Sequence, residues 1–228
     1  MKNAQAGSFG LRLDILPPSQ GRLWQELRET PRSFVLYGGT ALALRLGHRQ
    51  SLDFDFFSNE RFDPGELFRS LPYLKDGRVD QRGDNTLSVV VERQGPVKIS
   101  FFGDLGMKCV REPDIVAGHG LQIASLLDLL ATKLKTIQQR AEAKDYLDMA
   151  AGIAAGISVS EALGAAIAVY GNTFNAMTAL KALTYFGDGN LPSLAVSTQE
   201  RLRAAAEAVE LDAVPRLPAR PGIARQDL

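Results

Sequence analysis

Two aspartates, Asp53 and Asp55, stand one residue apart in a run that alternates apolar and acidic residues. Successive side chains of a β-strand point to opposite faces of the sheet. The run therefore predicts a strand with both carboxylates and Ser51 on one face and with Leu52, Phe54 and Phe56 on the other. Neighbouring carboxylates repel each other, and hard cations bind such oxygen pairs readily. The spacing indicates a metal site, the alternative being a solvated strand face.

A glycine turn precedes the acid pair. Gly38-Gly39-Thr40 follows the short apolar run Phe34 to Tyr37 and opens a predicted helical segment over 41–47. Backbone N–H groups and the positive end of a helix dipole both favour an anion at such a turn. We predict a phosphate cradle here, although glycine pairs are also common in plain tight turns. A phosphate site followed by a metal-binding acid pair indicates nucleotide chemistry.

A lysine in the second half of the chain is the next chemical signal. Ser125 begins a predicted helix, with Asp128 as its capping partner. At the helical period, Lys133 falls within the apolar stripe of Leu126, Leu130 and Ile137, whereas Lys135 lies on the opposite side, toward solvent. A lysine inside an apolar stripe costs free energy unless another group pairs with it.

Charged residues continue the line of Lys133. Arg140 and Lys144 follow at the same period, Asp145 lies beside Lys144, and Asp148 comes one turn later if the helix runs on. A basic line that leads to an aspartate pair suits a triphosphate with its metal. The alternative is a lysine at the edge of the core, paired with Glu142 or Asp145.

The elements that position these residues indicate an α/β (α+β) fold. Strand-like runs at Thr86 to Arg93 and Val97 to Phe102 are joined by Gln94-Gly95-Pro96, a hairpin signal, and predict a mixed sheet. After residue 120 nearly every segment suits a helix. We predict an α/β core over 1–120, a helical domain over 121–213 and a disordered or loosely attached tail over 214–228. Residues 1–18 suit a poorly ordered start or an edge segment.

Composition excludes several classes of protein. The 228 residues are 45% apolar and 23% charged with a formal net charge of zero, as in an ordinary soluble globular protein. A single cysteine, Cys109, rules out an internal disulfide framework and a cysteine-rich zinc site. His48 and His119 are too far apart in sequence to suggest a chelate. Because neither a signal peptide nor a membrane-spanning run is visible, we expect a cytoplasmic protein without a membrane partner.

These motifs together resemble a known family. GGTALAL, the pattern R-x-S-x-D-x-D, the lysine helix and the segment Lys144-Asp145-Tyr146-Leu147-Asp148 are similar to the AbiEii/AbiGii nucleotidyltransferase toxins. These are the toxin half of type IV toxin–antitoxin and phage abortive-infection systems, in the DNA polymerase β-like nucleotidyltransferase superfamily. The resemblance covers roughly Phe34 to Ala150. It implies a polymerase β-like core with a mixed sheet, followed by a C-terminal helical bundle.

The resemblance also implies roles for individual residues. The phosphates of a nucleoside triphosphate (NTP) would be held at Gly38, Gly39 and Thr40, with help from Arg45 or Arg49, and Asp53 and Asp55 would bind Mg²⁺ or Mn²⁺ with Ser51 beside the metal. Lys133 would contact the triphosphate, and Arg140 and Lys144 would extend the nucleotide site. Asp145 and Asp148 match the acidic end of the last motif, and either one could carry its role.

The implied reaction transfers a nucleoside monophosphate to an acceptor hydroxyl and releases pyrophosphate. Some family members act on tRNA 3′ ends, so tRNA is the first acceptor to test, and a cognate antitoxin is the expected protein partner. One departure concerns the third carboxylate that the superfamily places on a later strand, because Ser100 stands at that position here. Two alternatives therefore stay open: a degenerate module that binds nucleotide without turnover, and a kinase-like phosphotransferase on the same fold.

Overall fold

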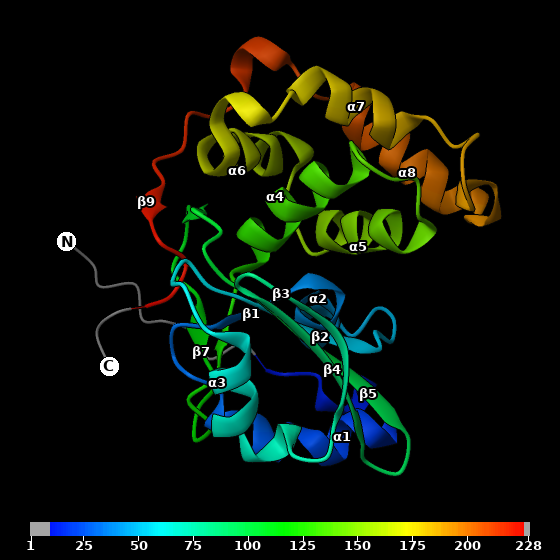
Figure 1. Ribbon diagram of the computed structural model, residues 1–228. Coiled ribbons are helices and arrows are strands. Elements are labelled where there is room, and N and C mark those ends of the chain that lie inside the picture. The colour runs from blue at the N-terminus through cyan, green and yellow to red at the C-terminus, as the bar shows by residue number, and fades with distance from the viewer. Residues whose placement is uncertain (1–9, 226–228) are drawn as a thin grey trace. The chain divides into compact units, whose positions relative to one another are not determined.

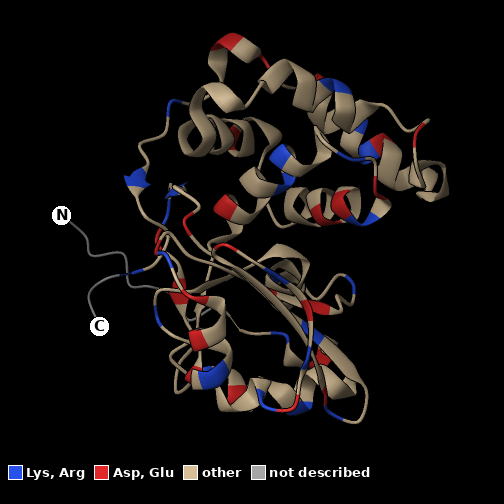
Figure 2. Ribbon diagram, in the orientation of Figure 1, with Lys and Arg blue, Asp and Glu red and all other residues tan. Residues whose placement is uncertain are grey.

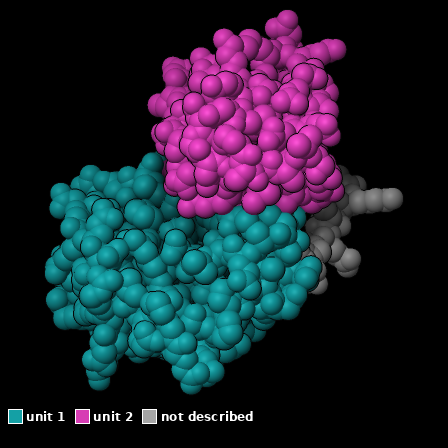
Figure 3. Space-filling view, turned by 90° about the vertical axis from the view of Figure 1, so that its right-hand side faces the viewer, with its two compact units in different colours: residues 1–106, 112–124, 223–228 teal, residues 107–111, 125–222 magenta. Residues whose placement is uncertain are grey.

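The computed structural model describes residues 10–225. The chain divides into two compact units (Figures 1 and 3). Unit 1 comprises Met1–Gly106, Glu112–Ala124 and Ile223–Leu228, and unit 2 comprises Met107–Arg111 and Ser125–Gly222. This division differs from the expected one. Residues 107–111 and 214–222 belong to the helical unit, and residues 121–124 and 223–225 belong to the α/β unit.

Unit 1 is built on a mixed sheet of seven strands in the order β3-β4-β5-β2-β1-β8-β7 within the described residues. The pairs β1–β8 and β2–β5 are parallel, and the other neighbours are antiparallel. The mixed sheet predicted from the sequence is therefore confirmed. The strands span β1 Val35–Tyr37, β2 Asp53–Phe57, β3 Arg78–Gly83, β4 Thr86–Glu92, β5 Pro96–Phe102, β7 Asp114–Ile115 and β8 Gln122–Ile123.

The apolar face of this sheet forms the core of unit 1. Phe54 and Phe56 on β2 and Ile99 and Phe101 on β5 have no exposed surface. The ring centroid of Trp24, at the end of α1, lies 6.4 Å from that of Phe54. Leu52 was expected on this face but is 68% exposed, because β2 begins only at Asp53. The α-helices of unit 1 are α1 Pro18–Trp24, α2 Gly38–Leu46 and α3 Pro64–Ser70.

Unit 2 consists of helices and one short strand pair (Figure 1). The helices share a core that includes Leu130, Leu163 and Leu202. Among the described residues, no single helix combines the length and apolar character needed to cross a membrane, although one bent helix pair (143–154 and 159–173) passes that test jointly. The helices span α4 Leu126–Ile137, α5 Ala143–Ala154, α6 Val159–Tyr170, α7 Ala176–Thr184 and α8 Val196–Glu207, and the strands span β6 Lys108–Cys109 and β9 Arg220–Pro221.

The start of α4 agrees with the predicted cap. The hydroxyl of Ser125 accepts a hydrogen bond from the backbone N–H of Asp128 at 3.0 Å. The Asp128 carboxylate accepts the backbone N–H groups of Val110 and Arg111 at 2.7 and 3.0 Å. This aspartate therefore also joins the helix to the separate segment 107–111.

The expected loose tail is instead paired and partly buried over residues 214–225. Arg220 and Pro221 form β9, which runs antiparallel to β6 in unit 2. In unit 1, Ile223 is 1% exposed, and the backbone N–H of Arg225 donates to Gln122 Oε1 at 2.7 Å. Composition did not indicate that this segment is ordered, because one buried isoleucine and a two-residue strand change the composition very little among prolines and arginines. The predictions for residues 1–9 and 226–228 lie outside the described residues.

Candidate functional site

The two aspartates lie on β2, in the middle of the unit 1 sheet. Asp53 is exposed and Asp55 is half-buried. Phe54, which lies between them, and Phe56, which follows, are buried. The predicted alternation is therefore present, and both carboxylates share one face of the sheet. Asp55 is paired in register with Tyr37 of β1, the residue immediately before the glycine turn. The turn thus starts next to the second carboxylate.

Both glycines of the turn leave room for neighbouring side chains. Gly38 has a φ of +73°, and a Cβ there would lie 2.6 Å from Asp55 Oδ2. A Cβ on Gly39 would lie 2.7 Å from Arg49 Nη2 and 2.8 Å from Ser51 Oγ. The backbone therefore approaches these three polar side chains more closely than any residue with a Cβ would allow. The turn is therefore packed directly against the side chains of Asp55, Arg49 and Ser51.

The N-terminus of α2 adds a favourable site for an anion. Tyr37, the residue before the helix, makes no side-chain capping hydrogen bond. The hydroxyl of Thr40 is buried and donates to the backbone oxygen of Asp53, which ties the first turn of α2 to β2. Thr40 thereby positions the turn beside the acid pair. The first N–H groups of a helix carry a partial positive charge that suits a phosphate oxygen.

The two candidate arginines are placed differently. Arg45 donates to the backbone oxygens of Ala124 and Ile123 and forms an ion pair with Asp114 at 2.7 Å. Its guanidinium is therefore bound to β7 and the end of β8, and burial lowers the pKa of Arg45 despite that carboxylate. Arg49 lies against Gly39 and donates to the backbone oxygen of Gln50 at 2.9 Å. Of the two, Arg49 is the arginine beside the turn.

The donors on β2 fit a hard divalent cation. Mg²⁺ is commonly held by one or two carboxylates, with the remaining positions taken by water and substrate phosphates. Asp53 and Asp55 would supply the carboxylates, and the backbone of Gly38 lies against Asp55 Oδ2. Within residues 10–225, no group of three or more carboxylate, imidazole or thiol side chains is arranged to hold a metal. Any further ligands of such a cation would have to come from water or from a bound substrate.

Ser100 stands where the third carboxylate was sought. It pairs in parallel register with Asp55, so the two side chains share a face of the sheet. Its hydroxyl is buried and lies 2.9 Å from that of Ser88 on β4. Asp104 follows the end of β5 and forms an ion pair with Arg61 at 3.0 Å. Neither residue places a carboxylate next to Asp55 on this side.

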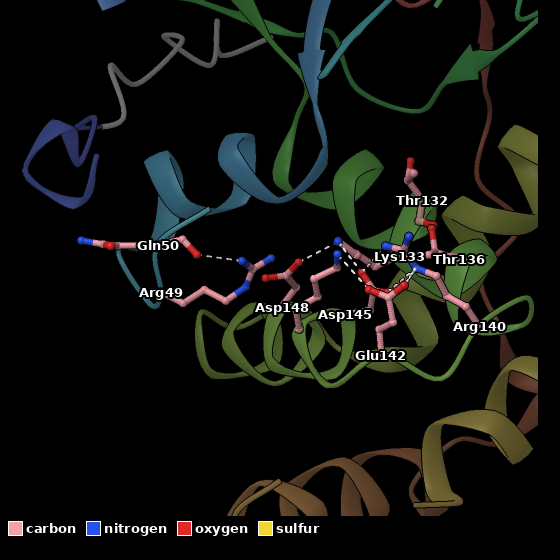
Figure 4. A network of polar contacts seen from close by, with 10 residues as sticks. Arg49, Gln50, Thr132, Lys133, Thr136, Arg140, Glu142, Asp145 and Asp148 are labelled. Carbon is pink, nitrogen blue, oxygen red and sulfur yellow. Dashed lines mark hydrogen bonds and ion pairs between the residues drawn. The ribbon is translucent and has the colours of Figure 1, made fainter. Parts of the chain in front are cut away.

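Unit 2 holds the second cluster, around Lys133. Lys133 is 6% exposed, and its ammonium lies 2.7 Å from Asp145 Oδ1 and 2.7 Å from Asp148 Oδ2 (Figure 4). Both carboxylates are fully buried. Since a buried ammonium needs charged partners, these contacts explain how a lysine stays in the apolar stripe of α4. Asp145 was an expected partner of Lys133, whereas Asp148 was not.

Asp145 also binds a second cation. Arg140 donates to its two oxygens at 2.8 and 3.2 Å (Figure 4). Burial alone raises the pKa of a carboxyl group, but the Arg140 hydrogen bond and the Lys133 charge outweigh it and lower the pKa of Asp145 from its ordinary value of 3.8. Lys144 is exposed and pairs with Glu142 at 2.8 Å. Of the three predicted cations, Lys133 and Arg140 are brought together and Lys144 is not.

The charged line from Lys133 was expected to reach Asp148 only if the helix continued, and the helix does not continue. α4 ends at Ile137, and Arg140 lies in the connection before α5 begins at Ala143. Lys133 meets Asp145 and Asp148 across two helices rather than along one. Lys135 faces away from these carboxylates, as expected, with its ammonium bound to the backbone oxygen of Thr173 and 5.8 Å from the ring centroid of Tyr170.

Two charged residues near the acid pair were missed. Lys98 on β5 pairs in register with Asp53, and its ammonium lies 2.8 Å from Asp80 Oδ2 on β3. The strand β3 has six exposed residues and an irregular register, so it lacks the alternation that reveals a strand in sequence. Lys98 could have been found, since it shares a strand face with Ser100. Basic and acidic residues are otherwise interspersed along both units (Figure 2).

A comparison of the chain with protein families finds one match over most of its length. The model of the nucleotidyl transferase AbiEii toxin family, of type IV toxin–antitoxin systems, matches residues 22–219. Among curated proteins, an uncharacterised protein of Aquifex aeolicus (strain VF5) is 34% identical over 118 residues. That match spans 51% of this chain and only 55% of the relative's length.

Solved structures share the fold. The toxin MenT4 of Mycobacterium tuberculosis H37Rv, a nucleotidyltransferase, aligns over 88% of this chain and 84% of its own with a TM-score of 0.61 and 19% identity. A protein of H. pylori described as a putative nucleotidyltransferase aligns over 83% of this chain and 90% of its own with a TM-score of 0.51 and 18% identity. At such identities the likeness concerns the fold alone.

Proposed function

Because this chain belongs to the AbiEii family of nucleotidyl transferase toxins, we propose that it is a metal-dependent transferase that moves a nucleoside monophosphate from an NTP to an acceptor hydroxyl. The observation that carries the proposal is the close approach of the Gly38–Gly39 turn to Asp55, Arg49 and Ser51. A phosphate on the turn would lie beside the carboxylates that bind its metal.

Unit 1 supplies the nucleotide and metal residues of this proposal. The first N–H groups of α2 and the guanidinium of Arg49 bind phosphate oxygens, while Thr40 and Gly38 keep the turn next to Asp55. Asp53 and Asp55 hold Mg²⁺ or Mn²⁺, which, when bound, stabilises the charge that develops on the phosphate oxygens. Arg45 has a structural role in this scheme, since it is bound to Asp114 and to the backbone of Ile123 in β8.

Unit 2 supplies Lys133, which we expect to contact the triphosphate. Its two carboxylate partners fix the direction of the ammonium group, and Arg140 holds the Asp145 carboxylate in place. Asp145 and Asp148 thus act by positioning the lysine rather than by touching the substrate. Lys144, paired with Glu142 at the surface, is not needed for this role.

The chemical step forms a bond between the acceptor oxygen and the α-phosphorus and breaks the bond from that phosphorus to the leaving pyrophosphate. Ser100 cannot take up the acceptor proton as a carboxylate does, so we expect that proton to pass to water. A tRNA 3′ end is the acceptor to test first. We also expect the activity to be inhibited by a cognate antitoxin protein, for which a small regulator encoded next to this chain is the first candidate.

The experiment incubates the protein with Mg²⁺, total tRNA and each of the four NTPs labelled on the α-phosphate. Labelled RNA is the expected result, lost in Asp53→Ala and retained in Lys75→Ala, a change at an exposed lysine of unit 1. Nucleotide binding without a labelled product would instead favour the degenerate module that Ser100 keeps open. A parallel series labelled on the γ-phosphate covers the kinase-like alternative, in which protein or a small molecule acquires the label.

A further inference from the structure

A lysine stands beside the proposed metal site. Lys98 on β5 is the in-register neighbour of Asp53 on the parallel strand β2, just as Ser100 is the neighbour of Asp55. In-register neighbours point to the same face of a sheet. The face that carries the two carboxylates therefore also carries an ammonium group.

An aspartate on the edge strand holds that ammonium. Lys98 is paired in register with Val90 of β4, and beyond it lies Asp80 of β3, whose Oδ2 is 2.8 Å from Lys98 Nζ. Asp80 falls at the point where the register between β3 and β4 shifts. Arg78 approaches the other oxygen of Asp80 at 3.3 Å. The ion pair keeps the end of Lys98 directed toward the edge of the sheet.

The acid pair still interacts with this ammonium. The hydrogen bond to Asp80 is the main reason why the pKa of Lys98 is raised, and the charges of Asp80, Asp53 and Asp55 raise it further. An attraction between Lys98 and the acid pair acts in both directions, because coupling between two bound charges is reciprocal. A positive charge at Lys98 therefore weakens the binding of a second cation by Asp53 and Asp55.

We propose that Lys98 is a built-in counter-ion of the Asp53–Asp55 pair, restrained by Asp80, which makes the free protein a weak binder of divalent metal and leads it to take up metal together with the triphosphate. The proposal deepens the function above and rests on its metal site. A triphosphate brings several negative charges, which offset the charge of Lys98 and add ligands to the metal. The residue thus sets the order in which the site is filled.

Three variants test this reasoning. Lys98→Met keeps much of the side-chain length and removes the charge, so metal should bind about tenfold more tightly without nucleotide. Asp80→Asn releases the ammonium toward the acid pair, so metal should bind more weakly than in the parent protein. The double variant should match Lys98→Met, since Asp80 acts only through Lys98. Lys75→Met, the same change at an exposed lysine of unit 1, is the matched control and should leave metal binding unchanged.

The measurement is a titration of the full chain with Mn²⁺, in which free Mn²⁺ is followed by electron paramagnetic resonance. It is made without nucleotide and with a triphosphate analogue that has a methylene group between its α- and β-phosphorus atoms. The analogue should improve Mn²⁺ binding more in the parent protein than in Lys98→Met. Thermal unfolding of each variant checks that the fold is kept.

The result that overturns the proposal is a Lys98→Met protein that binds Mn²⁺ no more tightly than the parent, while Asp53→Asn and Asp55→Asn still abolish binding. If instead these two carboxylate variants bind Mn²⁺ as the parent does, the metal site of the proposed function is itself wrong. The two failures are therefore distinguished within one set of titrations.

Discussion

At the scale of single residues, the buried lysine of α4 has two separable roles. Lys133 forms ion pairs with Asp145 and Asp148, neither of which has exposed surface. It is also our candidate contact to the triphosphate. Removing one partner of a buried ion pair leaves an uncompensated charge and costs about 3–5 kcal/mol. Loss of activity in a simple lysine variant could therefore reflect loss of the fold.

We predict that neutralising a carboxylate together with the lysine separates these roles. Lys133→Met should lower the free energy of unfolding by about 3 kcal/mol, and adding Asp148→Asn should recover part of that loss because one fewer buried carboxylate has lost its Lys133 partner. Nucleotide transfer should stay absent in both proteins. Lys135→Met, whose ammonium binds the backbone of Thr173, should keep its activity. Equal loss of transfer in the Lys133 and Lys135 variants would contradict the assignment.

The acid dependence of stability gives a second prediction at this scale. The folded-state pKa of Asp145 is lowered, so its ionised form stabilises the protein above the ordinary value of 3.8, and that contribution is lost as the pH falls through the lower folded value. The free energy of unfolding should decrease below about pH 4, and more steeply in the parent than in Asp145→Asn. Urea unfolding between pH 3 and 7 measures both slopes. Identical slopes would show that Asp145 does not contribute.

The sequence predicted the burial of Lys133 but not the geometry of its cluster. Helical periodicity placed Lys133 among buried residues, and the structure agrees. Periodicity could not show that α4 ends at Ile137, since neither glycine nor proline follows to mark the end. The choice of Asp148 as a partner depends on how α5 packs against α4, and no local pattern encodes that packing. Asp80 was missed for the same reason, because its role depends on a contact across two strands.

At the scale of elements, the chemistry proposed for unit 1 depends on the turn between β1 and α2. Tyr37 ends β1 in register with Asp55, and Gly38 then changes direction with a φ of +73°. The first turn of α2 is bound to β2 through Thr40. The alternating run and the glycine pair were both visible in sequence. Their proximity was not, because antiparallel pairing of β1 with β2 follows only from the complete sheet.

The two glycines of this turn should respond differently to alanine. Gly38→Ala places a Cβ at positive φ, which costs about 1–2 kcal/mol, and adds a contact of 2.6 Å with Asp55 Oδ2. It should therefore lower both stability and Mn²⁺ binding. Gly39→Ala has no such backbone cost and mainly displaces the end of the Arg49 side chain and Ser51 Oγ. It should keep its melting temperature within about 2 °C and lose triphosphate affinity, as calorimetry can measure.

If Gly39→Ala binds the triphosphate as well as the parent does, the turn is only a connection, and the phosphate site must be sought elsewhere. Leu46→Met, a change of similar size near the other end of α2, serves as the control for general effects on the helix. It should alter neither the affinity nor the stability by much.

At the scale of the whole molecule, neither unit is a continuous stretch of chain. The chain enters unit 2 at Met107, leaves it after Arg111, returns at Ser125 and leaves again after Gly222. The segment 107–111 contributes β6, which pairs with β9, and two backbone N–H groups that bind Asp128. The sequence predicted two consecutive domains, because a five-residue segment that crosses into the other unit does not change the composition.

We predict that the helical unit requires this short segment. A fragment of residues 125–222 should unfold at a lower temperature than one in which residues 107–111 are joined to Ser125 by a glycine–serine linker. The shorter fragment leaves the Asp128 carboxylate and β9 without their partners from 107–111. Thermal melts followed by circular dichroism compare the two fragments. Equal melting temperatures would show that the segment adds nothing to the stability of unit 2.

The placement of residues 223–225 has a consequence for biosynthesis. Ile223 and the backbone of Arg225 complete the α/β unit, yet they follow all five helices α4 to α8 in the order of translation. A nascent chain whose glycine turn and acid pair have already left the ribosome still lacks these contacts. Its sheet unit reaches full stability only after the helical unit has emerged. An incomplete translation product of this toxin-family protein would thus carry the candidate nucleotide residues on an unfinished scaffold.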